Sequence, residues 1–245
     1  MSTTTHAPDA SVAVDSPRPF DRSAPLDRQH VYVLAGAYVV LLTIYTAVGF
    51  AITQWWDTSS AGDREADLNR WFEGHRTEQR NQLAEWGSAL SNTETKIALV
   101  LMLLPLMLWM YRRWHDWAFL TIALLFEVSV FGISSKIVGR ARPPVEQLDG
   151  APTASWPSGH IAAAVVFYVG LAMVVFWHTR WWVSRTVFTV IAIAAPVIVI
   201  TARLYQGMHY ATDAAGGVML GILALLLVRE LMIRSGRDPR VTRSL

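Results

Sequence analysis

Apolar and polar positions form long separate blocks along the chain. Six stretches are almost wholly apolar: 31–53, 97–111, 117–138, 161–177, 183–202 and 214–233. A membrane-spanning helix needs about 20 predominantly apolar residues, and shorter stretches reach that length by recruiting interfacial side chains. The pattern therefore predicts an all-α fold, an integral membrane bundle of six transmembrane helices over residues 31–235.

The blocks between and around these spans are polar. Segment 54–96 is charged, with apolar residues at loosely helical spacing. It predicts one or two amphipathic helices on the external membrane surface, with a mobile polar loop as the alternative. Residues 1–30, rich in Ser, Thr, Pro and Asp, are typical of a disordered tail without a cleavable signal peptide, and 236–245 form a second tail.

The composition is typical of a membrane protein, and the distribution of basic residues predicts its orientation. Of the 245 residues 53% are hydrophobic and only 16% are charged, against about 25% in soluble domains. The chain has no cysteine, which excludes disulfides and thiolate metal sites, and a net charge of +2 gives no nucleic-acid-binding surface. Arginines are more numerous on the side that carries both tails, so both termini are predicted to be cytoplasmic.

Three polar segments, 136–144, 156–160 and 203–213, fall on the external side in this topology. Arginine side chains and a helix N-terminus after Pro157 suit a phosphoryl group, while two histidines provide a nucleophile and a proton donor. Asp213 lies four residues after His209, on the same face of a helical turn. Carboxylates are too few for a two-metal site, so we expect arginines to neutralise the phosphate, with no metal and no cofactor.

These segments resemble the signature of the type 2 phosphatidic acid phosphatase superfamily, in its bacterial membrane-embedded branch. That signature is Lys, six residues, Arg-Pro; then Pro-Ser-Gly-His; then Ser-Arg, five residues, His, three residues, Asp. The second element is complete at 157–160, and the third fits with Ala202 in place of Ser. In the first, five residues separate Lys136 from Arg142, and Ser135 occupies the lysine position.

The resemblance implies a two-step reaction. His209 attacks phosphorus to form a phosphohistidine, His160 protonates the leaving oxygen and then activates water, and Asp213 orients His209. The phosphate oxygens would be held by Lys136, Arg142, Ser158, Gly159 and Arg203. Either the flexible lysine stem recovers the shifted register, or Lys136 only reaches toward the interface and Arg140 supplies the charge.

Three further residues are candidate substrate contacts. Arg140 and Tyr210 flank the motifs and would contact a headgroup. Glu127 lies in the middle of an apolar span, where it is either a protonated packing residue or a polar contact along a lipid tunnel.

The expected function is hydrolysis of a lipid phosphate at the outer face of a bacterial cytoplasmic membrane. Polyprenyl diphosphate, phosphatidylglycerophosphate and phosphatidic acid are the substrate types that the resemblance implies. The alternatives are a lipid phosphotransferase and a non-catalytic lipid transporter or scaffold. The expected partners are the lipid substrate and the bilayer, without nucleic acid, and the oligomeric state stays open.

Overall fold

The computed structural model describes residues 26–92, 114–150 and 154–236, with positions 95, 98, 99, 101 and 102 between the first two ranges. All regular elements within these residues are helices. They are α1 (Arg28–Ala51), the π-helical turn η1 (Ile52–Trp56), α2 (Ser60–Gly74), α3 (Glu78–Ala89), α5 (His115–Val138), α6 (Gly159–Ala164), the π-helical turn η2 (Val165–Val169), α7 (Gly170–His178), α8 (Trp182–Tyr205) and α9 (Ala211–Arg234). The all-α prediction is therefore confirmed for the described residues.

Five of these helical segments are long and apolar enough to cross a membrane. They are Arg28–Trp56, His115–Val138, Gly159–His178, Trp182–Tyr205 and Ala211–Arg234. Each coincides with a predicted span and extends it by a few residues. The predicted span 97–111 falls largely outside the described residues, as do positions 1–25 and 237–245, so the six-span count stays a prediction.

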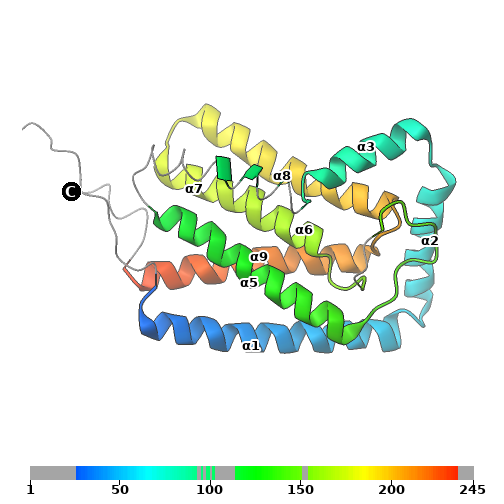
Figure 1. The fold of residues 1–245 in the computed structure, drawn as a ribbon, viewed down its shortest axis with the longest axis horizontal. Helices are drawn as coiled ribbons and strands as arrows, with labels where there is room; N and C mark the ends of the chain where they lie inside the picture. Colours follow the sequence, from blue (N-terminus) through cyan, green and yellow to red (C-terminus); the bar gives the residue numbers. More distant parts are fainter. Residues whose placement is uncertain are drawn as a thin grey trace, which may run out of the picture.

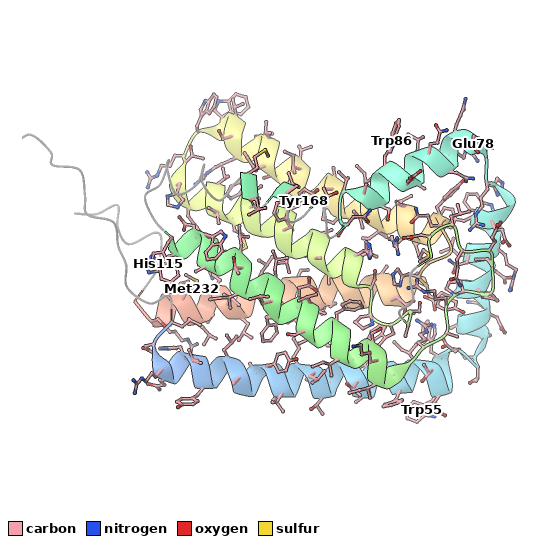
Figure 2. The ribbon with its side chains drawn as sticks, viewed as in Figure 1. Trp55, Glu78, Trp86, His115, Tyr168 and Met232 are labelled. Carbon is pink, nitrogen blue, oxygen red and sulfur yellow. The ribbon has the colours of Figure 1, made fainter. Side chains whose placement is uncertain are left out.

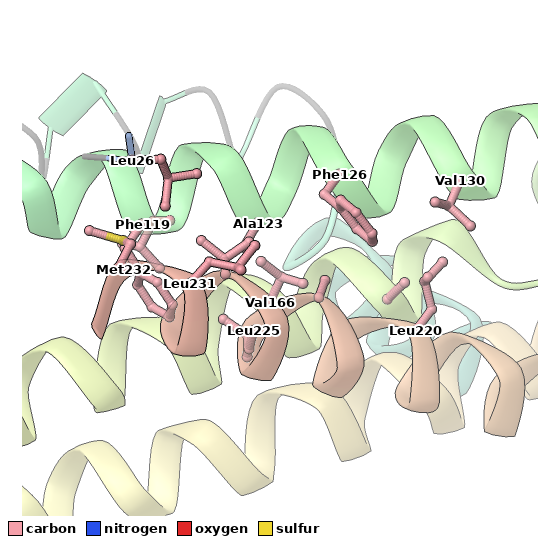
Figure 3. Packing of buried hydrophobic residues seen from close by; sticks show 14 of the residues in the cluster. Leu26, Phe119, Ala123, Phe126, Val130, Val166, Leu220, Leu225, Leu231 and Met232 are labelled. Carbon is pink, nitrogen blue, oxygen red and sulfur yellow. The ribbon is translucent and has the colours of Figure 1, made fainter. Parts of the chain in front are cut away.

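The long helices run side by side along the length of the molecule (Figure 1). Helix α9 packs against α1, α5 and α6. Its contacts with α1 and α5 contribute to the largest apolar core, where Phe119, Phe126, Leu220 and Leu225 are at most 5% exposed (Figure 3). A Cβ at Gly217 would lie 2.5 Å from the Ser158 carbonyl oxygen, so glycine is what allows α9 to approach the start of α6.

Residues 60–89 of the predicted external segment fold into α2 and α3 at one end of the bundle. The side chains of Ser59 and Thr77 accept hydrogen bonds from the first turns of α2 and α3 and so fix where each helix begins. Both helices pack against α8, and α2 crosses the end of the bundle (Figure 1). Trp55 and Trp86 project outward near this end, whereas His115 and Met232 mark the opposite end (Figure 2). Placement of α2 and α3 on a membrane surface stays a prediction.

Candidate active site

The three polar segments of the sequence meet at the end of the bundle that carries α2. The α5 helix ends at Gly139, whose φ of 64° is a left-handed conformation that turns the chain back toward the bundle. The Ser158 amide then donates to the Asp213 carbonyl oxygen at 3.1 Å. An Arg142 Nη1 group donates to the Met208 carbonyl oxygen, which links the first segment to the third.

His209 is 3% exposed and has a defined tautomer. Its Nδ1 lies 2.9 Å from the Ser155 carbonyl oxygen, and a carbonyl only accepts, so Nδ1 carries the proton. Burial lowers the pKa of His209 despite the nearby Asp213 carboxylate. The ring is therefore neutral, with a lone pair at Nε2.

Asp213 stands beside this ring without hydrogen bonding to it. Its Oδ2 lies 3.8 Å from His209 Nδ1, so the carboxylate acts on the neutral ring only as a nearby negative charge. The bond that sets the tautomer comes from the Ser155 carbonyl group, whereas sequence reasoning gave this role to the carboxylate. Oδ2 instead accepts hydrogen bonds from the Ser155 hydroxyl group and from the Tyr210 amide.

Only part of the Arg203 guanidinium group is bound by protein acceptors. The side chain is fully buried, and Nη1 donates to Asp149, Ser88 and Gln206. Its Nε and Nη2 atoms have no hydrogen-bond partner among the described residues, and neither has the buried hydroxyl group of Ser158. Because buried unpaired donors are costly, three of them in one site suit a ligand with several acceptor oxygens.

Two arginines lie close enough to influence each other. Burial and the neighbouring Arg203 charge both lower the pKa of Arg142, and the carboxylates of Asp213 and Asp149 oppose this only in part. Conversely, the hydrogen bond from Arg203 lowers the pKa of Asp149. Two guanidinium groups side by side are favourable where an anion binds between or beside them.

The Pro-Ser-Gly-His segment begins the third candidate span. Ser158 is the N-cap of α6, and a Cβ at Gly159 would lie 2.6 Å from the Phe131 ring, so the backbone fits here only as glycine. His160 follows in the first turn, partly exposed, with its carbonyl oxygen accepting a hydrogen bond from Ser91. The amide groups of this turn point out of the helix N-terminus, a favourable place for an oxyanion.

Not every residue predicted for the site joins this cluster. Lys136 is exposed in the last turn of α5, while Ser134 and Ser135 beside it are buried. One residue on a helix is about 100° of rotation, so the shifted spacing turns the lysine away from the buried face. Glu127 is buried in the middle of α5, and the Tyr210 ring packs 4.3 Å from the guanidinium carbon of Arg140.

Several polar residues at this end were missed by sequence reasoning. Ser155, Asp149 and Ser88 contact His209 or Arg203, while Asp57 and Glu65 bind the buried guanidinium group of Arg140. Most of them lie outside the motifs, and no local pattern distinguishes them from surface polar residues. Among the described residues, no group of three or more His, Cys, Asp or Glu is arranged to hold a metal ion.

Fold and site together define a helical, multi-span membrane protein with a buried histidine and arginine cluster at one end. The family model of the PAP2 superfamily matches residues 117–237, which include every motif residue, and the chain belongs to that superfamily.

Related proteins come from two bacteria. The chain is 26% identical over 165 residues to phosphatidylglycerophosphatase B of Bacillus subtilis, covering 64% of this chain and 78% of the relative. A crystal structure of a transmembrane PAP2-type phosphatidylglycerolphosphate phosphatase from Bacillus subtilis superposes with a TM-score of 0.69 at 22% identity, over 85% of this chain and 98% of the other. The crystal structure of Aquifex aeolicus LpxE superposes with a TM-score of 0.54 at 18% identity. The match covers 67% of this chain and 93% of the other.

Proposed function

We propose that this protein is a lipid phosphate phosphatase that works through a phosphohistidine on His209. The observation that carries the proposal is the neutral His209 ring with its Nε2 lone pair available. In the same site, Nε and Nη2 of Arg203 and the Ser158 hydroxyl group have no partner within the described part of the chain. A nucleophile and oxyanion donors in one buried site are the two requirements of phosphoryl transfer through a covalent intermediate.

In the first step, Nε2 of His209 attacks phosphorus, the N–P bond forms and the P–O bond to the lipid breaks. His160 donates a proton to the departing lipid oxygen. In the second step, His160 removes a proton from water, the water oxygen bonds to phosphorus and the N–P bond breaks, which releases phosphate. Arg142, Arg203 and the amide groups at the start of α6 stabilise the charge on the phosphoryl oxygens throughout.

A cavity of about 530 Å³ supports a lipid as the substrate. It lies between α1 and α9 and reaches Trp156 and Thr212, next to the motif residues Pro157 and Asp213. Its walls are mostly aliphatic and aromatic side chains of spanning helices, which suits a hydrocarbon chain.

The relatives support the choice of substrate class, since one is named a phosphatidylglycerophosphatase. We infer a phosphomonoester or diphosphate lipid, with phosphatidylglycerophosphate as the first candidate and phosphatidic acid and polyprenyl diphosphate as the others. The proposed location is a bacterial cytoplasmic membrane with both termini inside and the site facing outward.

Phosphate release from a panel of these lipids by the purified protein tests the proposal. We expect at least one lipid to be hydrolysed, and His209→Gln to abolish release and the acid-labile phosphoenzyme trapped from labelled substrate. His75→Gln is the matched control, because His75 is exposed at the end of α2. Phosphate appearing on a second lipid instead of in water would indicate a phosphotransferase, and no turnover of any lipid would favour a non-catalytic protein.

A further inference from the structure

The guanidinium group of Arg140 is completely occupied by protein acceptors. Its side chain is 1% exposed. Nε and Nη2 donate to Asp57 at 3.0 and 2.5 Å, Nη2 also donates to Glu65 at 3.4 Å, and Nη1 donates to Thr212 at 2.7 Å and Asp213 at 2.5 Å. An arginine has five N–H donors, and these contacts use all five. No donor is left for a headgroup, which was the role expected from the sequence.

The same residue is linked to the two groups that surround His209. Arg140 binds one oxygen of Asp213, and the Ser155 hydroxyl group binds the other. The Ser155 amide donates to the Arg140 carbonyl oxygen at 2.9 Å, and the Ser155 carbonyl oxygen accepts the His209 Nδ1 proton. Arg140, Ser155 and Asp213 therefore form a closed ring of hydrogen bonds, and His209 takes its tautomer from that ring.

Two carboxylates from outside the motifs complete the arrangement. Asp57 follows η1, and Glu65 lies on α2 and accepts a hydrogen bond from the Thr212 amide in the first turn of α9. Arg140 thus links Asp57, after η1, and Glu65, on α2, to the start of α9. Three carboxylates share this one guanidinium group, and Asp213 is fully buried, so loss of the cation would leave a buried negative charge without its direct partner.

We propose that Arg140 is a positioning residue, which holds Asp213 and Ser155 so that His209 keeps its Nδ1 proton and its reactive Nε2 lone pair. This inference rests on the proposed phosphatase function. It predicts that loss of Arg140 impairs the chemical step and leaves binding of the phosphoryl group intact, because all five N–H donors of the guanidinium group are taken by protein acceptors.

Steady-state kinetics of Arg140→Gln and Arg140→Lys separate the two roles. For a shift of the nucleophile by about 1 Å, we expect kcat to fall about 10²-fold. We expect KM and the vanadate inhibition constant to stay within about threefold of wild type. Lysine should rescue only in part, because one ammonium group cannot reach all the acceptors. Arg70→Gln is the matched control, since Arg70 is half exposed and, within the described ranges, pairs only with Asp67. A raised KM with unchanged kcat would identify Arg140 as a substrate contact and overturn the proposal.

Asp57→Asn is a second, milder variant, in case Arg140→Gln does not fold as judged by thermal unfolding in detergent. Asp57 is 30% exposed and binds the far side of the guanidinium group, so we expect a smaller loss of kcat with KM unchanged. Wild-type kcat in both Asp57→Asn and Arg140→Lys would refute the proposal.

The ¹⁵N NMR shifts of the His209 ring, assigned by difference from His209→Gln, need no turnover. We expect the Nδ1–H tautomer in wild type and a mixture of tautomers in Arg140→Lys. If wild type hydrolyses no lipid phosphate while this tautomer shift occurs, the proposed function fails and the positioning role survives. If wild type is active and neither the tautomer nor kcat responds, only the positioning role fails.

Discussion

Substitution of Arg203 by lysine tests how the site recognises a phosphoryl group. The buried guanidinium group uses Nη1 for protein contacts, and its Nε and Nη2 have no partner among the residues that the structure describes. Lysine retains the charge and can still reach Asp149, but it cannot offer two further donors in fixed directions. A hydrogen bond to a charged group contributes about 1.5–3 kcal/mol. Loss of one such bond to the transition state, at about 2 kcal/mol, lowers kcat/KM by ~30-fold.

The assay is phosphate release by Arg203→Lys in detergent micelles, together with the vanadate inhibition constant. Arg185→Lys is the matched control, because Arg185 lies at the other end of α8 and its guanidinium group donates to the carbonyl oxygens of Thr179 and Phe176, away from the site. We expect the control to match wild type in kcat/KM. If Arg203→Lys stays within threefold of wild type while folding normally, the unpartnered donors do not bind the phosphoryl group and the reasoning is wrong.

Three other predictions follow from burial and packing. Lys136→Met should change kcat/KM by less than about threefold, because the side chain is exposed away from the cluster; a loss comparable to that of Arg203→Lys would place Lys136 in the site. Gly216→Ala should lower the free energy of unfolding by about 1–3 kcal/mol and the thermal midpoint with it, since its Cβ would lie 2.5 Å from the Trp156 ring. The control Gly132→Ala, with open space around the position, should not lower the thermal midpoint. Burial lowers the pKa of His209, so its neutral, nucleophilic form persists below pH 6.5. The acid limb of the pH profile of kcat/KM should therefore lie below that value. A ¹⁵N titration of the ring with a midpoint above pH 6.5 would contradict this.

The sequence predicts those parts of this protein that are marked by a pattern of neighbouring residues. Five spans were located to within a few residues because each is a continuous apolar block, and bilayer thickness fixes its length. The motif residues Ser158, Arg203 and His209 were placed together because their segments leave the bundle on one side.

The site features that the sequence does not predict depend on contacts between residues far apart in the chain. Asp57 and Arg140 are 83 residues apart, and nothing in the charged segment 54–96 marks Asp57 or Glu65 as different from its surface acids. The side-chain direction of Lys136 depends on its position around the helix, and a shift of one residue turns that direction by about 100°. The hydrogen bond from His209 to Ser155 involves a backbone carbonyl group, for which side-chain identity gives no signal.

The attachment of α1 has a consequence for how the chain is made. Few residues of this helix are buried, and Tyr45 on it is linked to residues that follow much later: it donates to the Gly216 carbonyl oxygen, and its own carbonyl oxygen accepts from the Trp156 indole. Asp57, just after η1, accepts from Arg140. Synthesis proceeds from the N-terminus, so α1 enters the bilayer before any of these partners exists. The first span of the nascent protein therefore has no packing partner among the described spans until α5 has been translated, and its link from Tyr45 to Gly216 forms only after the start of α9 has been made.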